Sequence, residues 1–289
     1  MTIVCSSAIP ADWVRALAGP GTEVRSVMPP RTDPHAFQPT PEHVKQLLRA
    51  DLLVGFDPLL EPWMDQIVKS NNLSNKVLWI GKPWISDLGN ALSCCPVHGE
   101  AGGKHALLRK AEPVDPHVWT DPELVAAMGK AIHAELSRRG QAREPGGAVR
   151  LEAFLAMTAG VDAELRTRLD RLPAERRGII THHDNLGRMA RRYGLRVEGV
   201  ILRAATTEAA DPSAREMVRL VELARSRGVR AVVVDKGQRA PAAETLALEA
   251  GLPPPLALRV DTLEAEGPGS TWEGMMREAG RGLAEALSR

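Results

Sequence analysis

Short apolar runs alternate with helical stretches along this chain, and one long helical stretch near the middle separates two rounds of that alternation. A strand, a helix and a second strand in succession are typical of a βαβ unit, whose strands pair in parallel. We therefore predict two mostly parallel sheets, each with helices packed against it. The predicted strands cover residues 2–6, 23–28, 51–55 and 77–80 in the first round, and residues 178–181, 196–201, 231–235 and 256–260 in the second.

The middle of the chain is predicted to join the two rounds. Residues 121–139 are strong helix formers, and Pro145, Gly146 and Gly147 then interrupt the pattern. A second helix is expected over residues 149–172, and at 1.5 Å per residue it would be about 36 Å long, enough to run along both lobes. The predicted fold is α/β, with two βα-type lobes joined by one long helix. The segments are a first lobe over 1–147, a linking helix over 148–172 and a second lobe over 173–289.

The charges of the chain are nearly balanced. Its 37 Lys and Arg against 36 Asp and Glu leave a net charge of +1, which gives no overall electrostatic reason to expect a nucleic acid or an anionic membrane as partner. Three cysteines, two of them adjacent, form neither a disulfide framework nor a paired zinc motif. No stretch reaches the roughly 18 uninterrupted apolar residues of a membrane span, and residues 1–10 are expected to begin the first strand rather than to act as a targeting peptide. We expect a monomer with a small ligand.

One tripeptide occurs twice. Asp-Pro-His ends at His35 and again at His117, while a third histidine, His183, follows the predicted strand over residues 178–181. In open α/β sheets, ligands bind beyond the carboxyl ends of strands, where these side chains are expected to project. Neutral imidazoles suit Zn²⁺, and a carboxylate could complete a tetrahedral site. The pattern favours a metal site, but Asp-Pro also starts turns, so two ordinary turns in a proline-rich chain are the alternative.

Five segments lie in order along nearly the whole chain and read DPHAFQPTPEHVKQLLRADLLV, DPHVWTDPELV, THHDNLGRMARRYGL, TTEAADPSAREM and DTLEAEGPGSTWEGMM. Together they resemble the zinc and manganese solute-binding proteins of bacterial ABC importers (the cluster A-I metal-binding family). The first two carry the most specific resemblance, a DPH with a downstream PTP and AD, followed by DPHxWxDP. The resemblance implies two α/β lobes linked by a single rigid helix, with the metal held where the lobes meet.

The resemblance also implies four metal ligands. His35 and His117 match the two DPH histidines of the family, and His183 matches a third ligand that is His in zinc binders and often Glu in manganese binders. His182 is its neighbour and the alternative for that position. The fourth ligand, an Asp ahead of a glycine-rich turn, matches Asp261.

Two features leave parts of this assignment open. Many zinc-specific members carry a long His-rich loop, whereas residues 86–116, expected to form a long surface loop, contain only two cysteines and the histidines His98 and His105 before the second DPH. In addition, Asp235 also ends a predicted strand of the second lobe. The fourth ligand could therefore be Asp261, Asp235 or water, and the choice of Asp261 depends on one matched motif.

The resemblance implies capture of a divalent metal, Zn²⁺ with Mn²⁺ as the alternative, and its delivery to an ABC importer permease and its ATPase. It also implies a periplasmic or otherwise extracytoplasmic location, with membrane anchoring of the native precursor left open. Four protein ligands would leave no open position for a reactive water, as expected of a binding protein rather than an enzyme. The alternatives are a zinc hydrolase that uses a metal-bound hydroxide, for which no HExxH motif is present, and a surface adhesin.

Overall fold

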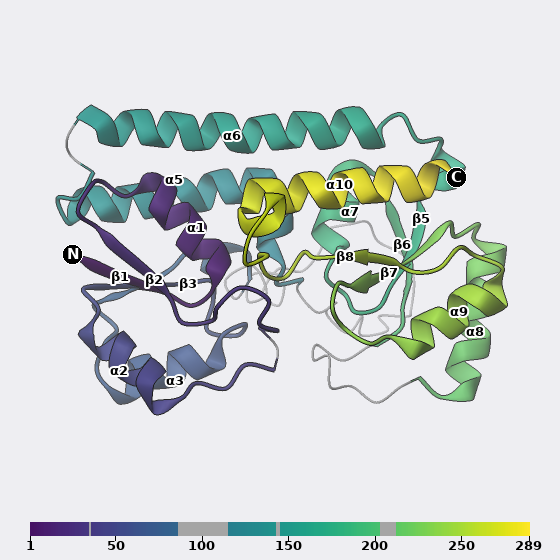
Figure 1. Ribbon diagram of the computed structural model, residues 1–289, viewed down its shortest axis with the longest axis horizontal. Coiled ribbons are helices and arrows are strands. Elements are labelled where there is room, and N and C mark those ends of the chain that lie inside the picture. Colours follow the sequence, from purple (N-terminus) through teal and green to yellow (C-terminus); the bar gives the residue numbers. More distant parts are fainter. Residues whose placement is uncertain (35, 86–114, 143–144, 203–211) are drawn as a thin grey trace, which may run out of the picture.

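The computed structural model describes residues 1–34, 36–85, 115–142, 145–202 and 212–289, which form two α/β lobes side by side (Figure 1). Among these residues each lobe contains a sheet of four parallel strands. The strand orders, β2-β1-β3-β4 and β6-β5-β7-β8, follow the same scheme, so the two lobes repeat one topology. The α/β prediction with two parallel sheets is confirmed. The strands are β1 Thr2–Cys5, β2 Glu23–Ser26, β3 Leu52–Gly55, β4 Val77–Trp79, β5 Gly178–Thr181, β6 Arg196–Val200, β7 Ala231–Asp235 and β8 Leu256–Leu258.

The central strands β1, β3, β5 and β7 are mostly apolar because both faces of each sheet are covered. Ile3 and Cys5 point into a core on one face of the first sheet, while Val4 packs into a separate core on the other face. In the second sheet, Ile179 and Ile180 divide between two cores in the same way. This alternation follows from the two-residue period of a strand.

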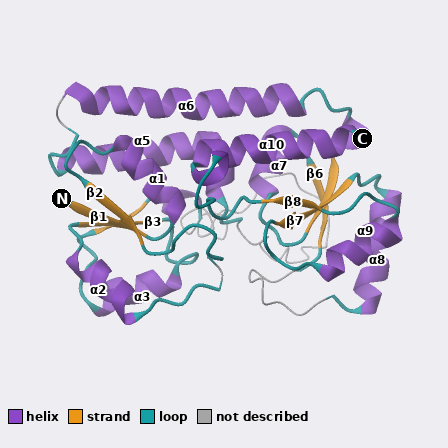
Figure 2. Ribbon diagram, viewed as in Figure 1, coloured by secondary structure: helices purple, strands orange, loops and turns teal. Residues whose placement is uncertain are grey.

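Helices lie on both sides of each sheet (Figure 2). In the first lobe α2 and α3 lie on one side of the sheet, and α1 and α5 lie on the other; in the second lobe α8 and α9 lie on the outer side, as Figure 1 shows. Their bounds are α1 Ala8–Leu17, α2 Pro41–Arg49, α3 Pro62–Ser70, α5 Pro122–Arg138, α7 Gly187–Tyr193, α8 Ala214–Ser226, α9 Pro241–Ala250 and α10 Trp272–Ser288.

One long helix, α6 (Pro145–Leu169), runs along both lobes and packs against α5 and α10 (Figure 1). A single apolar core continues beneath these helices from the first lobe into the second, with Trp13, Leu165 and Trp272 among its fully buried members. The two lobes are therefore connected by shared packing as well as by the chain.

The long helix begins earlier than the sequence predicted. Pro145 occupies its first turn, where the missing N–H and fixed φ of proline are tolerated. A Cβ atom on Gly147 would overlap the carbonyl oxygen of Ala142, so glycine permits the tight approach at the start of the helix. Residues 145–147 of the expected break at 143–147 are instead the beginning of α6, and residues 143 and 144 lie outside the described residues.

Other boundaries shift by a few residues. The strand expected over residues 256–260 ends at Leu258, and the one expected over 23–28 ends at Ser26. Residues 86–114 of the predicted surface loop lie outside the described residues. No helix in the described part of the chain is both long and apolar enough to cross a membrane.

Candidate metal centre

The candidate site lies at the carboxyl ends of the second sheet's strands, where the first lobe meets them. His183 comes two residues after β5 ends, and Asp261 three residues after β8 ends. Neighbours β6 and β7 lie on opposite sides of β5, so the chain reverses its direction of winding at β5, and such a switch point leaves a crevice for a ligand. His117 reaches the same place from the first lobe, directly before the short 3₁₀ helix Val118–Thr120.

Three potential metal-ligating side chains meet there. One ligand atom from each of His117, His183 and Asp261 lies within 4.8 Å of the others. The two imidazole ring centroids are 5.7 Å apart, and Nε2 of His183 lies 3.1 Å from Oδ2 of Asp261. A tetrahedral Zn²⁺ with bonds of about 2.0–2.2 Å separates its ligand atoms by about 3.3–3.6 Å. Small side-chain adjustments would bring all three onto one ion.

Each imidazole in this group is held by a carboxylate. Nδ1 of His183 lies 2.6 Å from Oδ2 of Asp235, and Nδ1 of His117 lies 2.8 Å from Oδ1 of Asp115. An ionised carboxylate can only accept, so each Nδ1–H donates, and Nε2 is the nitrogen of each ring with which a metal ion would bond. Carboxylate partners of this kind orient metal-binding histidines and increase their basicity.

The carboxylates are themselves fixed. The Asn185 side-chain amide donates to Oδ1 of Asp235 at 2.8 Å and to Oδ2 of Asp261 at 3.0 Å, which ties the two acids together. The backbone N–H of Arg188 donates to Oδ2 of Asp115 at 2.8 Å, and its Nε donates to the carbonyl oxygen of Asp115. Helix α7 of the second lobe therefore positions the acid that orients His117.

The buried charges shift the ionisation of the site. Burial lowers the pKa of His183, but hydrogen bonds with Asp235 and Asp261 outweigh it and raise the pKa to about 10. Burial raises the pKa of Asp261, but the hydrogen bond from His183 and the nearby His117 bring that pKa well below its usual range. At neutral pH without metal, a protonated His183 therefore lies between two carboxylates.

The indoles of Trp119 and Trp272 form hydrogen bonds between the lobes beside the site. The Nε1–H of Trp119, two residues after His117, donates to the carbonyl oxygen of Val260 at 2.6 Å. The Nε1–H of Trp272 donates to the carbonyl oxygen of Trp119 at 2.8 Å. Both rings are buried, so these bonds fix Val260, and with it the neighbouring Asp261, relative to the first lobe.

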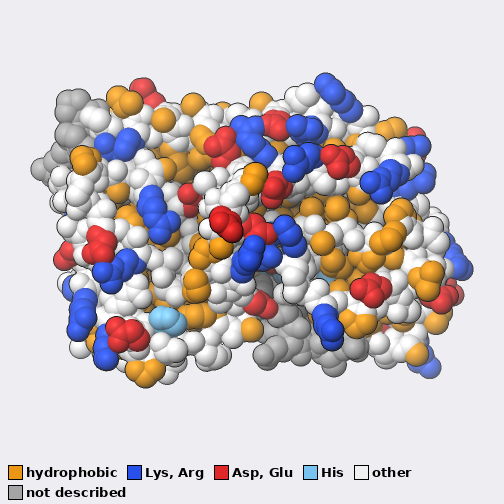
Figure 3. Space-filling model, viewed as in Figure 1, with side chains coloured by type: hydrophobic (Ala, Val, Ile, Leu, Met, Phe, Trp, Pro, Cys, Tyr) orange, Lys and Arg blue, Asp and Glu red, His pale blue; other side chains and the backbone are white. Residues whose placement is uncertain are grey.

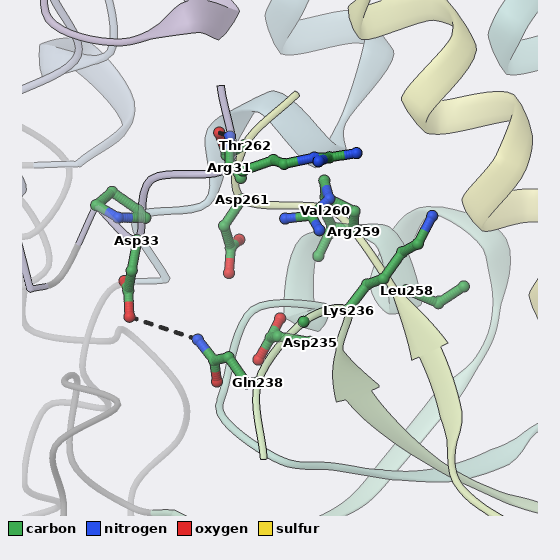
Figure 4. A pocket seen from close by; sticks show the side chains of 12 residues that line it. Arg31, Asp33, Asp235, Lys236, Gln238, Leu258, Arg259, Val260, Asp261 and Thr262 are labelled. Carbon is green, nitrogen blue, oxygen red and sulfur yellow. Dashed lines mark hydrogen bonds between the residues drawn. The ribbon is translucent and has the colours of Figure 1, made fainter. Parts of the chain in front are cut away.

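A pocket of about 460 Å³ opens beside Asp261 between the lobes. In Figure 4 the carboxylates of Asp235 and Asp261 point into this pocket from the second lobe. Asp33 and Pro34 line it from the first lobe, and Gln238 Nε2 donates to Oδ2 of Asp33 at 3.4 Å, as the dashed line in Figure 4 marks.

Residues 3–286 match the family model described as zinc-uptake complex component A, periplasmic. The chain belongs to this family. The match over residues 3–286 includes almost all of the 289 residues. It therefore covers both lobes, the long helix and the candidate site.

Among the relatives of this chain, the zinc-binding protein AdcA of Streptococcus pyogenes is 26% identical to it over 254 residues. The matched part covers 83% of this chain and 47% of AdcA. The chain thus spans about half the length of that relative. The manganese ABC transporter substrate-binding lipoprotein PsaA of Streptococcus pneumoniae is 22% identical, covering 100% of this chain and 89% of PsaA. The structure of the periplasmic zinc-binding protein TroA from Treponema pallidum matches with a TM-score of 0.79 and 26% identity, over 100% of this chain and 99% of TroA.

Three of the four ligands predicted from the sequence lie together, namely His117, His183 and Asp261. His35 lies outside the described residues, although the preceding Pro34 lines the pocket. His182, the alternative to His183, also lies in a group with His183 and Asp235, so position alone does not exclude it.

The sequence analysis did not identify Asp115, Asn185 and Arg188 as part of the site. Asp115 could have been found from the sequence, because it is the first residue of the second DPH. A carboxylate two positions before a histidine can reach the ring of that histidine. The contacts of Asn185 and Arg188 join segments 50 to 76 residues apart, and no local pattern indicates them.

Proposed function

We propose that this chain captures one Zn²⁺ between its lobes and delivers it to the permease of an ABC importer. The observation that carries the proposal is the group of His117, His183 and Asp261, whose ligand atoms converge at the junction of the lobes. His117 comes from the first lobe and the other two from the second, so one ion would bridge both. The family of the chain and the zinc-binding relatives AdcA and TroA support the same function.

In this proposal Nε2 of His117 and of His183 bind the ion, and Asp261 supplies the one anionic ligand. His35 is the proposed fourth ligand, since the segment that leads to it already lines the pocket through Asp33 and Pro34. Asp235 and Asp115 act behind the ligands by holding Nδ1 of each imidazole. The geometry favours Asp261 over Asp235 as the ligand, because Asp235 already bonds the ring nitrogen that faces away from Asp261.

Three imidazoles with one carboxylate favour Zn²⁺ over Mn²⁺, because Mn²⁺ prefers oxygen ligands and binds more weakly in the divalent series. Mn²⁺ remains the alternative cargo, in line with the manganese relative PsaA.

Capture rather than catalysis is the proposed role. A site closed by four protein ligands has no open position for a metal-bound hydroxide, and none of the relatives reported above is named as a hydrolase. The proposed partners are the importer permease and its ATPase, and the proposed form is a monomer in an extracytoplasmic compartment. We propose a division into a first lobe over 1–147, a linking segment over 148–172 that is built mainly from α6, and a second lobe over 173–289.

Metal titration of purified protein tests this proposal. Protein stripped with a chelator should bind one Zn²⁺ per chain and should bind Mn²⁺ more weakly. A variant with His117 and His183 both replaced by Ala should keep its fold by circular dichroism and lose binding. Undiminished zinc binding by that double variant would exclude this site.

A further inference from the structure

A salt bridge crosses between the lobes next to the proposed metal site. Nε of Arg31, in the first lobe, lies 2.7 Å from Oε2 of Glu264, in the second. The Glu264 carboxylate is 8% exposed, whereas the Arg31 side chain is 59% exposed. Figure 3 shows Lys or Arg side chains next to Asp or Glu side chains in the middle of the face drawn there, where the two lobes meet.

The backbone of Arg31 is also bound to the second lobe. Its N–H donates to the carbonyl oxygen of Leu263 at 3.0 Å and approaches Oγ1 of Thr262 at 3.2 Å. Arg31 has a φ of 66°, a left-handed conformation that is costly for a residue with a Cβ and persists only where its surroundings enforce it. The contacts with residues 262–264 supply that enforcement.

Glu264 has two further cationic partners, and both come from its own lobe. Nζ of Lys236 lies 2.8 Å from its Oε1, and Nε of Arg259 lies 3.0 Å from the same atom. These three cations lower the pKa of Glu264 to about 2. Glu264 is thus an anion held firmly in the second lobe, and Arg31 is the partner that brings the first lobe to it.

Both ends of this contact are close in sequence to proposed ligands. Arg31 precedes His35 by four residues, and Glu264 follows Asp261 by three. Between Arg31 and His35, Asp33 makes a second contact across the lobes with Gln238. The segment that leads to one ligand is therefore held directly against the segment that leaves another.

We propose that Arg31 is a positioning residue whose contact with Glu264 clamps the two lobes and slows release of the bound metal. The inference rests on the proposed function, since it assigns the clamp to that same site. Release of an ion held by ligands from both lobes requires the ligand-bearing segments of the two lobes to move apart at the site, and that movement breaks the Arg31–Glu264 pair. Binding from the open form does not need the pair, so the clamp acts on the dissociation rate more than on the association rate.

The test compares Arg31→Gln with Lys236→Gln in the full chain. Both changes remove one half-exposed cation from Glu264, and both leave that carboxylate two cationic partners, but only Arg31 belongs to the opposite lobe. Zinc release is followed in a stopped-flow instrument after mixing the Zn²⁺-loaded protein with excess chelator. Arg31→Gln should release zinc about two- to fivefold faster, the range expected for a partly exposed ion pair, and Lys236→Gln should match the unmodified protein.

Two further measurements separate a clamp from a merely structural role. Melting of the metal-free protein should respond similarly to both variants, and added salt should accelerate release from the unmodified chain more than from Arg31→Gln. Equal release rates for Arg31→Gln and the unmodified chain, or equal acceleration by both variants, would overturn the clamp while leaving the proposed function intact. Failure of the unmodified chain to bind Zn²⁺ would overturn both.

Discussion

Asp235 accepts a hydrogen bond from Nδ1 of His183 at 2.6 Å. The opposite ring nitrogen, Nε2, consequently points to Asp261. His183 thus has a carboxylate on each side. In the proposed site Asp235 orients the ring, and Asp261 binds the metal together with His183. The Asn185 side-chain amide donates to both acids and fixes them in these positions.

Exchanging each acid for its amide should separate these two tasks. Asp261→Asn removes the anionic ligand and should weaken zinc binding more than Asp235→Asn, which should cost about 10- to 100-fold in affinity, as is usual for the partner of a ligating histidine. Competition titrations against a chromophoric chelator would measure both. Asp65→Asn, the same change in helix α3 where the carboxylate pairs with Lys69 and not with the site, is the control. A larger loss for Asp235→Asn than for Asp261→Asn would make Asp235 the ligand.

Zinc binding should release a proton from His183. The pKa of this imidazole is raised to about 10 in the metal-free protein, so at pH 7 it is protonated and must lose that proton to coordinate. Affinity should rise about tenfold per pH unit between pH 7 and pH 9, because one proton competes with the metal. Calorimetry in buffers of different ionisation enthalpy counts the protons released. The same experiment on His183→Ala should show the proton missing.

The same shift predicts how the metal-free protein responds to pH. Because the folded pKa of His183, about 10, lies above the ordinary value of 6.5, the stabilisation is fully present below pH 6.5. It is lost as pH rises toward 10. Urea unfolding of the metal-free chain should show a falling free energy of unfolding across this window, and His183→Ala should flatten the change. A constant free energy in the unmodified chain would contradict the buried imidazolium.

The sequence predicted the fold more completely than it predicted the candidate metal site. Apolar strands such as residues 178–181 are patterned locally, and that pattern sufficed for two parallel sheets and the long helix. The start of α6 was missed because Pro145 and Gly147 disfavour helix interiors. Pro145 is tolerated because it lies in the first turn, and only the position of Ala142 in three dimensions shows why glycine is needed at 147.

The site depends on contacts that a linear pattern does not contain. His117 and His183 stood out through a repeated tripeptide and a strand end, yet their convergence depends on how the lobes meet. The strand pattern alone did not separate Asp235, the last residue of β7, from Asp261, which follows β8, and the choice of Asp261 depended on the resemblance to one family motif. The contact between Arg31 and Glu264 joins positions 233 residues apart. The ligand role of His35, which lies outside the described residues, stays a prediction.

A histidine series should sort ligands from neighbours. His35→Ala, His117→Ala and His183→Ala should each lower zinc affinity by more than the 10- to 100-fold of an outer-shell change. His43→Ala should not, because His43 accepts a hydrogen bond from the Thr40 backbone and caps helix α2. That control should instead lower the free energy of unfolding by about 1 kcal/mol. His182→Ala should bind zinc nearly as the unmodified chain does; if it alone abolishes binding, the ligand is one residue earlier than proposed.

The indole of Trp119 joins the two lobes beside the site. Trp119→Phe keeps an aromatic ring in the core but removes the donor to the carbonyl oxygen of Val260, which sits next to Asp261. A buried acceptor left without its donor costs about 1–3 kcal/mol, and Asp261 loses its fixed distance from His117.

Trp13→Phe is the matched control, because Trp13 is equally buried and its Nε1 has no hydrogen-bond partner among the described residues. Both variants lose the same ring volume, so the difference between their free energies of unfolding in urea isolates the hydrogen bond. Trp119→Phe should be the less stable of the two and should also bind zinc more weakly, whereas Trp13→Phe should keep the affinity of the unmodified chain. Equal affinities for both variants would mean that the indole stabilises the lobes without positioning Asp261.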